Sequence, residues 1–364
     1  MEYRNYSIDS LKFFCILGVI AIHTNPFGGI ELNFIGSRYI GIIINTIVRV
    51  CVPLFFVSSG YFFYNKCNKE YMKKYTMNLI KILASWIVIY ILYNISINVL
   101  SNLINSRFIF DGIVDFFSGF NLLNIYYATG IVKYHLWYLS AMIIIIPTLY
   151  FVIDKNLVDK SIKVSLILNI IGVLIPVFIS ADLWYRVRDA LFFGLFYVLL
   201  GVYIKKYECE FKKKIEQIST LKYIAVIIIL FGISIIERYI YLSVFNGAGD
   251  YLISTIPLSI FIFGICIVNI NLFKGSIINK LGKNTLGIYV IHPLIMEIVS
   301  LLLHILNIEW ISNTLIWQII YTPTVLIVSF ISYKIIQVPK RLILNLTGYD
   351  NTYKYGKKKS DKAI

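Results

Sequence analysis

The feature that most constrains this chain is a series of ten long apolar runs, separated by segments that carry most of its charge. A helix needs about 20 predominantly apolar residues to cross a bilayer, and the runs approach that length. They lie near residues 8–24, 40–63, 76–100, 136–153, 162–180, 188–204, 221–242, 251–270, 284–304 and 313–336. We therefore predict an all-α fold: a polytopic integral membrane protein with ten transmembrane helices.

The composition supports this class and argues against a soluble one. Hydrophobic residues make up 59% of the chain and charged residues 15%, whereas soluble domains are about 45–50% apolar and about 25% charged. The net charge of +15 could indicate a nucleic-acid partner. However, the basic residues lie between the apolar runs and form no basic domain, so we expect no nucleic-acid binding.

The distribution of basic residues predicts the orientation of the chain. With the N-terminus in the cytoplasm, 25 of the 34 lysines and arginines fall in cytoplasmic segments and six in external loops. Cytoplasmic loops of membrane proteins carry such an excess, so both termini are predicted to be cytoplasmic. We divide the chain into a transmembrane domain, 1–336, and a basic cytoplasmic tail, 337–364, close to anionic lipid headgroups.

Two further features of the sequence, a long external loop and the cysteines, lead to predictions. The external loop 101–135 is rich in Phe and Tyr and is expected to form short interfacial helices. The five cysteines have no CxxC spacing and form no cluster with the four histidines. Neither a disulfide framework nor a metal site is therefore expected.

The first apolar run contains the most informative polar residues. Asp9, Lys12 and His23 are its only acidic, basic and imidazole groups. On a helix, Lys12 and His23 would lie within about 20° of each other and roughly 16 Å apart along the axis. Ionisable groups inside a membrane usually face a partner or an aqueous cavity, so this stripe suggests a site. The alternative is that Asp9 and Lys12 only cap the helix and extend to its polar entrance.

Other basic residues are candidates for the same site. Arg49 lies too deep in the second run to reach the surface easily and should face the bundle interior. Nearby Ser58, Ser59 and Gly60 (in the run 40–63) are better explained by close helix packing. At the cytoplasmic start of the third run, Lys74 and Lys81 share one helix face and could neutralise phosphates. The alternative is ordinary positive-inside charge.

Three later segments add candidates. The fourth run opens with Tyr-His-Leu-Trp-Tyr-Leu, which places His135 and Trp137 together; an interfacial aromatic belt would explain the tryptophan but not the histidine. Arg188 opens the sixth run from outside. His292 lies near the middle of the ninth run, before Pro293, where a buried structural histidine is the alternative to a functional one.

Four of these segments, in the same order, resemble motifs of the acyltransferase-3 family of integral membrane acyltransferases. The spacing Lys12-x10-His23 resembles its Arg-x10-His motif, and RVCVPLFFVSSGYFF its second helix. YHLWYL and LGKNTLGIYVIHPL resemble its fourth-helix opening and its late histidine helix. The resemblance extends from about Tyr6 to Ile336. Two branches look most similar: the enterobacterial common antigen O-acetyltransferases, and the membrane half of vancomycin-resistance serine racemases.

The resemblance implies a ten-helix protein of the bacterial cytoplasmic membrane. Such proteins move an acyl group, usually acetyl, from cytoplasmic acyl-CoA to a hydroxyl of an envelope glycan, glycolipid or similar acceptor. His23 would be the catalytic histidine and Lys12 the basic motif residue. The positions where the family has arginines thought to meet CoA phosphates are here Lys73, Lys74 and Lys81. Lysine lacks the bidentate phosphate geometry of arginine, so these positions depart from the family pattern.

A mechanism follows from these positions. His23 could take the proton of the acceptor hydroxyl as it attacks the thioester, and Arg49 or Arg188 could stabilise the oxyanion. Direct transfer and an acyl-histidine intermediate both remain open. The rival function is transport, of a small solute such as serine or of polysaccharide, with the polar stripe lining the path. The residues carry no signal for a particular acceptor, acyl chain or oligomeric state.

Overall fold

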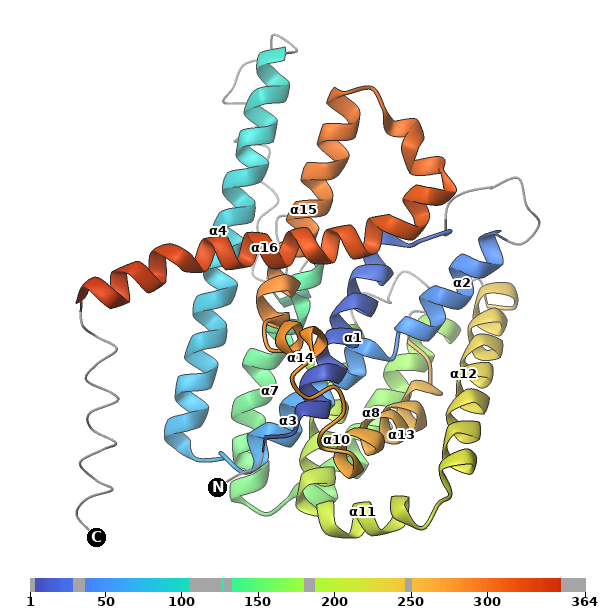
Figure 1. Ribbon diagram of the computed structural model, residues 1–364. Coiled ribbons are helices and arrows are strands. Elements are labelled where there is room, and N and C mark those ends of the chain that lie inside the picture. The colour runs from blue at the N-terminus through green and yellow to red at the C-terminus, as the bar shows by residue number, and fades with distance from the viewer. Residues whose placement is uncertain are drawn as a thin grey trace.

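The computed structural model describes residues 4–28, 37–104, 126–127, 133–179, 187–245 and 251–347, and all regular elements in these ranges are helices (Figure 1). Eight helical segments are long and apolar enough to cross a membrane. They are Tyr6–Thr24, Tyr39–Tyr64, Lys69–Ile97, Tyr134–Asp154, Val158–Phe178, Thr220–Ser243, Thr285–Ile305 and Leu315–Gln337. The predicted all-helical, multi-pass membrane architecture is therefore confirmed.

The other two predicted spans are helical but shorter. One consists of a π-helical turn and a helix, Ala190–Lys206, which bends by 84° into the next helix, Glu208–Glu216. The other is the apolar helix Thr255–Val268 of 14 residues. Within the described residues the count is thus eight spans, or nine if the bent pair is one span. The total of ten and the side on which each terminus lies stay predictions.

The described elements are named here in chain order. In chain order they are α1 (Tyr6–Thr24), α2 (Ser37–Val48), α3 (Cys51–Tyr64), α4 (Lys69–Ile104), η1 (Tyr134–Leu136), α7 (Trp137–Asp154), α8 (Val158–Phe178), η3 (Ala190–Gly194), α10 (Leu195–Lys206), α11 (Glu208–Glu216), α12 (Thr220–Ser243), α13 (Thr255–Val268), α14 (Ile277–Gly282), α15 (Thr285–Ile305), η4 (Glu309–Asn313) and α16 (Leu315–Thr347). In the view of Figure 1, α16 runs across the direction of α4 and α15.

Helix α1 is surrounded by other helices, as Figure 1 shows, and packs against α2, α3, α13, α14, α15 and α16. Its start is fixed by Asn5, whose side chain accepts a hydrogen bond from the Ile8 amide at 3.0 Å and donates one to the Cys266 carbonyl at 2.8 Å. Ile8, Ile16 and Ile20 are fully buried. Polar side chains on this helix therefore face protein or an internal cavity.

The second predicted span, expected as one continuous apolar run, contains a break between two helices. Helix α2 ends at Val48 and α3 begins at Cys51, so Arg49 and Val50 form the connection. Pro53 explains the break, because it has no N–H to donate to the Arg49 carbonyl and its ring would clash with that carbonyl in a continuous helix. In the first turn of α3 the same proline is well tolerated.

Helices α3 and α10 approach each other through two glycines. A Cβ at Gly60 would lie 1.9 Å from the Val198 carbonyl oxygen, and one at Gly201 would lie 2.0 Å from the Val57 carbonyl oxygen. These distances leave no room for a side chain. The expected packing role of the Ser-Gly segment in the second run is confirmed at Gly60.

The close approach predicts the effect of a single methyl group. Gly60→Ala should force the two helices apart and lower the free energy of unfolding by about 1–3 kcal/mol, as overpacking typically does. Gly232→Ala, on α12, is the matched control, because a Cβ there meets nothing within 4 Å. Thermal unfolding of both variants in detergent measures the difference. Equal midpoints would show that α3 and α10 can separate without loss.

Two predicted segments lie largely outside the described residues. Of the aromatic loop 101–135, the structure describes 101–104, 126–127 and 133–135, and Tyr126 donates a hydrogen bond of 2.9 Å to Asp189. Of the tail 337–364 it describes residues 337–347, which continue α16.

Candidate active site

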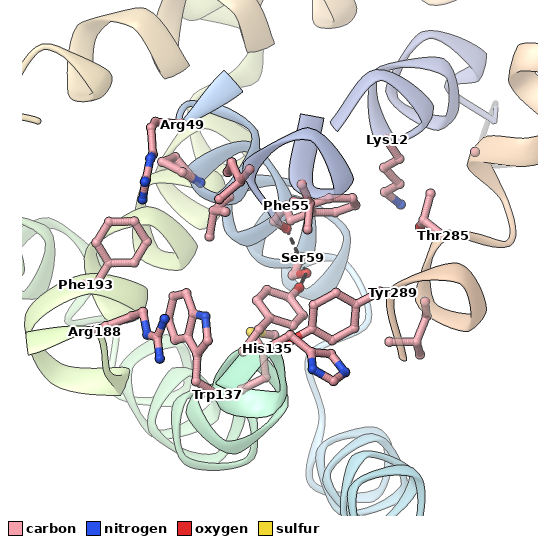
Figure 2. Close-up of a pocket in the computed structure, with 18 of the residues that line it drawn as sticks. Lys12, Arg49, Phe55, Ser59, His135, Trp137, Arg188, Phe193, Thr285 and Tyr289 are labelled. Carbon is pink, nitrogen blue, oxygen red and sulfur yellow. Dashed lines mark hydrogen bonds between the residues drawn. The ribbon is translucent and has the colours of Figure 1, made fainter. Parts of the chain in front are cut away.

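A pocket of about 380 Å³, here called the inner pocket, lies between α1, α3, α4, α7, α13 and α15 (Figure 2). Seven of the predicted site residues line it, and they come from segments far apart in the chain. These residues are Asp9, Lys12, His23, Arg49, His135, Trp137 and Arg188. The tertiary fold thus brings together most of the polar groups that the sequence singled out.

The inner pocket extends along α1. Lys12 and His23 both line it, so the two residues share a face of the helix as predicted. Lys12 lies at the end that also includes Arg4 and Lys283, and its ammonium group is 4.6 Å from the centre of the Phe62 ring. One end of the pocket is therefore cationic, and the imidazole of His23 lies about three helical turns away.

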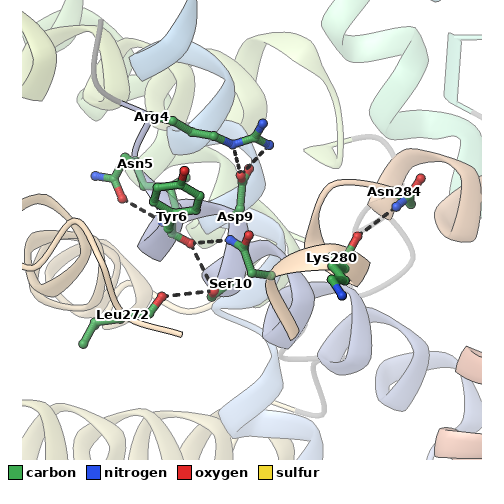
Figure 3. A network of polar contacts seen from close by, with 10 residues as sticks. Arg4, Asn5, Tyr6, Asp9, Ser10, Leu272, Lys280 and Asn284 are labelled. Atoms are coloured by element: carbon green, nitrogen blue, oxygen red, sulfur yellow. Dashed lines mark hydrogen bonds and ion pairs between the residues drawn. The ribbon is translucent and has the colours of Figure 1, made fainter. Parts of the chain in front are cut away.

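Asp9 has a different role from its neighbours. Its carboxylate accepts two hydrogen bonds from the Arg4 guanidinium, at 2.7 and 2.9 Å (Figure 3). Close by, the Ser10 hydroxyl lies 3.0 Å from the Tyr6 carbonyl and 3.3 Å from the Leu272 carbonyl and shares its one proton between them, which ties the start of α1 to the segment before α14. Asp9 is therefore paired with Arg4, whereas the cap of α1 is Asn5, and the roles of Asp9 and Lys12 stay predictions.

Three histidines lie together at the other end of α1. The ring centres of His23 and His292 are 5.3 Å apart and stacked, and those of His135 and His292 are 5.5 Å apart. His135 and His292 are fully buried, whereas His23 is partly exposed to the pocket. His292 is absent from the pocket lining and supports His23 from behind. The sequence placed each histidine on its own helix but did not predict the cluster, which depends on α1 and α15 lying side by side.

The hydrogen bonds of the two buried histidines indicate which ring nitrogen carries the proton. His292 Nδ1 lies 2.7 Å from the Tyr289 carbonyl, which can only accept, so Nδ1 donates. The Tyr90 hydroxyl donates to the Val290 carbonyl at 2.9 Å, so it accepts from His135 Nε2 at 3.5 Å. His292 Nε2 and His135 Nδ1 then have no hydrogen-bond partner in the described part of the chain. Each buried imidazole beside His23 thus has one ring nitrogen in a hydrogen bond and one without a partner among the described residues.

Arginines occupy the side of the inner pocket away from Lys12, as Figure 2 shows. Arg49 Nε donates to Asn45 at 2.9 Å, and the Arg188 guanidinium lies 5.6 Å from the centre of the Trp137 ring. Both arginines line the same pocket as His23. Trp137 therefore contacts a site cation, which an interfacial belt would not require.

A π-helical turn places Arg188 next to the inner pocket. Asp189 is buried, and its side chain caps the turn Ala190–Gly194 by accepting a hydrogen bond of 2.8 Å from the Phe192 amide. Single π-turns inside helices occur frequently at functional sites. This turn follows Arg188 directly, and its Phe193 lines the same pocket.

The predicted phosphate-binding lysines lie elsewhere. Lys73, Lys74 and Lys81 are exposed on α4 and do not line the inner pocket, whereas Tyr75 and Leu79 of the same helix do. Lys283, which is not among the predicted site residues, does line it. Whether the α4 lysines bind CoA stays a prediction, but the cations in the pocket lining at this end are Arg4, Lys12 and Lys283.

Sequence reasoning missed several neutral residues of the site. The hydroxyls of Ser59 and Tyr138 are 3.0 Å apart, and the Tyr138 and Tyr289 ring centres are 5.7 Å apart; all three residues line the pocket. Tyr289 precedes His292 by one helical turn, so the spacing could have indicated it. Ser59 was assigned to packing alone. Among the described residues, no group of three or more His, Cys, Asp or Glu side chains could hold a metal ion.

Comparison with known proteins gives one family and two relatives. The sequence model of the acyltransferase-3 family, described as an acyltransferase domain, matches residues 5–334. Two proteins of Enterococcus faecalis named amino-acid racemase are similar. One is 28% identical over 58% of this chain and 30% of its own length; the other is 25% identical over 82% of this chain and 42% of its own length. The chain thus spans less than half of either relative. No solved structure matches it.

Proposed function

Because this chain belongs to the acyltransferase-3 family, we propose that it is a membrane O-acyltransferase. It would move an acetyl or other short acyl group from cytoplasmic acyl-CoA to a hydroxyl of an envelope glycan, glycolipid or similar acceptor, in the bacterial cytoplasmic membrane. The supporting observation is one pocket that has Lys12 and Lys283 at one end and, away from them, His23, which is backed by two further imidazoles. An acyl-CoA needs both ends, since its phosphates and its thioester are far apart.

The donor would bind along α1. If the N-terminus is cytoplasmic, the end with Lys12 and Lys283 opens toward the cytoplasm, where these cations would meet the CoA phosphates. Arg4 already pairs with Asp9 and contributes less. The pantetheine arm would then follow the pocket toward His23. The exposed lysines of α4 would add a weaker and more strongly screened attraction.

The chemistry requires one base and one cation at the thioester. His23 would take the proton of the acceptor hydroxyl as its oxygen bonds to the thioester carbon. Arg49 or Arg188 would stabilise the negative charge that develops on the carbonyl oxygen. When the carbon–sulfur bond breaks, the thiolate of CoA would accept the proton from His23. His292, held by the Tyr289 carbonyl and stacked on His23, would keep the His23 ring in one plane.

The donor site can be tested with two pairs of lysine variants. Lys12→Ala with Lys283→Ala should weaken CoA binding by about tenfold or more, since each charge-assisted hydrogen bond contributes about 1.5–3 kcal/mol. Lys74→Ala with Lys81→Ala should weaken it less, and the effect should shrink at high salt. Lys12→Arg restores the family residue and should retain binding. Calorimetric titration of CoA into the purified protein measures all three.

The result also decides between the two phosphate sites. If the α4 pair weakens binding more than the pocket pair, the phosphates lie on the outer face of α4 as the family resemblance implies. If neither pair changes CoA affinity, these lysines have no part in donor binding, and the donor end of the proposal is wrong.

The second candidate is transport of a small solute such as serine, or export of polysaccharide. Two observations favour it: the pocket runs along a membrane helix, and both relatives are named amino-acid racemase. An amino-acid ligand needs partners for a carboxylate and an ammonium group. The inner pocket offers several cations, but its acid, Asp9, is already paired with Arg4. The match to the acyltransferase family over 5–334 therefore favours the enzyme.

A further inference from the structure

A second cavity, here called the outer pocket, adjoins the site at the far end of α1. It has a volume of about 320 Å³ and is formed by residues at the end of α1, in and beside η4, and at the start of α16. Thr24 lines the outer pocket and its chain neighbour His23 lines the inner pocket. The two cavities therefore lie at the same end of α1, on neighbouring residues of the helix.

The lining of the outer pocket is polar but carries no charge. Its side chains are three amides, four hydroxyls, one proline and one indole: Asn25, Asn313, Gln318, Thr24, Ser312, Tyr321, Thr322, Pro26 and Trp317. A phosphate, carboxylate or ammonium ligand is normally bound by an opposite charge, and this lining has none. Amides and hydroxyls both donate and accept hydrogen bonds, so they suit a ligand rich in neutral hydroxyls.

Aromatic rings form one wall of this pocket. The Trp317 and Tyr321 rings are stacked, with centres 4.8 Å apart and planes 21° apart, and both are partly exposed. Because the rings cover each other's facing surfaces, the pair offers an outer ring face together with ring edges that carry a hydroxyl and an indole N–H. Such a surface is suited to the C–H face of a sugar ring, while the amides are suited to its hydroxyls.

The walls are held in place by hydrogen bonds of their own. Gln318 accepts from the Phe27 amide at 2.8 Å and donates to the Ser312 carbonyl at 2.6 Å, which ties α1, η4 and α16 together. The Thr24 and Thr322 hydroxyls are 2.7 Å apart. The side-chain amides of Asn25 and Asn313 form no hydrogen bond with the described residues and are available to a ligand.

We propose that the outer pocket binds an uncharged sugar ring of the acceptor, with its C–H face on Trp317 and Tyr321 and its hydroxyls on Asn25 and Asn313. This rests on the proposed acyltransferase function and assigns the acceptor a site of its own. A sugar bound there approaches the end of α1 from the side opposite the donor. Its reacting hydroxyl would point past Thr24 toward His23.

The test uses direct binding, so that it does not depend on turnover. The 364-residue chain in lipid nanodiscs is titrated with the neutral trisaccharide maltotriose, and binding is followed by saturation-transfer NMR. Trp317→Ala and Asn313→Ala should each weaken binding by about tenfold, the loss of one ring contact or one hydrogen bond. Trp317→Phe should retain most of it. Trp310→Ala is the matched control, because Trp310 lies on η4, is 65% exposed and does not line the pocket.

The outcomes separate this proposal from the enzyme proposal. If the protein binds the trisaccharide in a way that depends on Trp317 but has no acyl-transfer activity, the sugar-site proposal is supported and the proposed acyltransferase function is refuted. If the protein transfers acyl groups but does not bind the trisaccharide, the sugar-site proposal is refuted. It is also refuted if Trp317→Ala and Asn313→Ala leave the trisaccharide affinity unchanged. Binding of L-serine that competes with maltotriose and requires Trp317 would also overturn it, since a zwitterion has no charged partner in this lining.

Discussion

Replacing His23 by alanine should lower the rate of acyl transfer by about 10²–10⁴-fold, the usual contribution of a general acid–base group. His23 faces the inner pocket, and its ring is stacked on His292 at 5.3 Å between centres. Alanine removes the base and leaves the cationic end, with Lys12 and Lys283, intact. CoA affinity and the thermal midpoint should therefore change little, while the turnover of acetyl-CoA with acceptor falls.

A matched histidine separates catalysis from the general loss of an imidazole. His304→Ala removes a histidine that is exposed, pairs with Glu309 at 2.7 Å and lies outside the inner pocket. It should keep the rate of the unmodified protein. If His23→Ala instead lowers stability and CoA binding together, His23 is a structural residue and the proposed base is wrong.

The second large effect is expected at Arg49. Removing one group that stabilises an oxyanion typically costs about 10²–10³-fold in kcat. Arg49 lines the inner pocket at the break between α2 and α3, where Asn45 holds its guanidinium. Arg49→Gln should lower kcat by that factor with little change in CoA affinity, and Arg49→Lys should recover part of it. Steady-state kinetics with acetyl-CoA measures both.

Two further arginines complete this experiment. Arg238→Gln, on α12 and outside the pocket lining, is the control for removing a guanidinium from a membrane helix. Arg188→Gln tests the competing candidate, whose guanidinium lies against Trp137. Normal kcat in Arg49→Gln together with a large loss in Arg188→Gln would move the oxyanion role to Arg188.

Much of the site could be predicted from the sequence because its signals are local. The cost of polar groups in a membrane and the residue spacing of one helix were enough to predict that Lys12 and His23 share a helix face and a site. Both residues line the inner pocket. The depth of Arg49 in its run placed it in the interior for the same reason. These inferences needed no knowledge of which helices are neighbours.

The rest of the site depends on which helices are neighbours, and the spacing of residues along one helix does not indicate this. His292 joins His23 only because α1 and α15 lie side by side, and Lys283 enters the pocket for the same reason. The break at Arg49 comes from Pro53. This proline is a local signal in the sequence, but the run was predicted as one span because it is apolar throughout. The outer pocket is built from neutral residues, which carry no signal in a search for charged and imidazole groups.

The measurement that tests the central claim most directly compares acyl transfer and transport in one preparation. The purified protein is reconstituted in liposomes, and two quantities are followed: release of free CoA from acetyl-CoA with a neutral glycan acceptor, and uptake of labelled L-serine. We predict that acceptor-dependent CoA release occurs and is lost in His23→Ala, with no serine uptake above that of empty liposomes. Serine uptake that His23→Ala abolishes, without CoA release in either protein, would contradict the enzyme and establish the transporter.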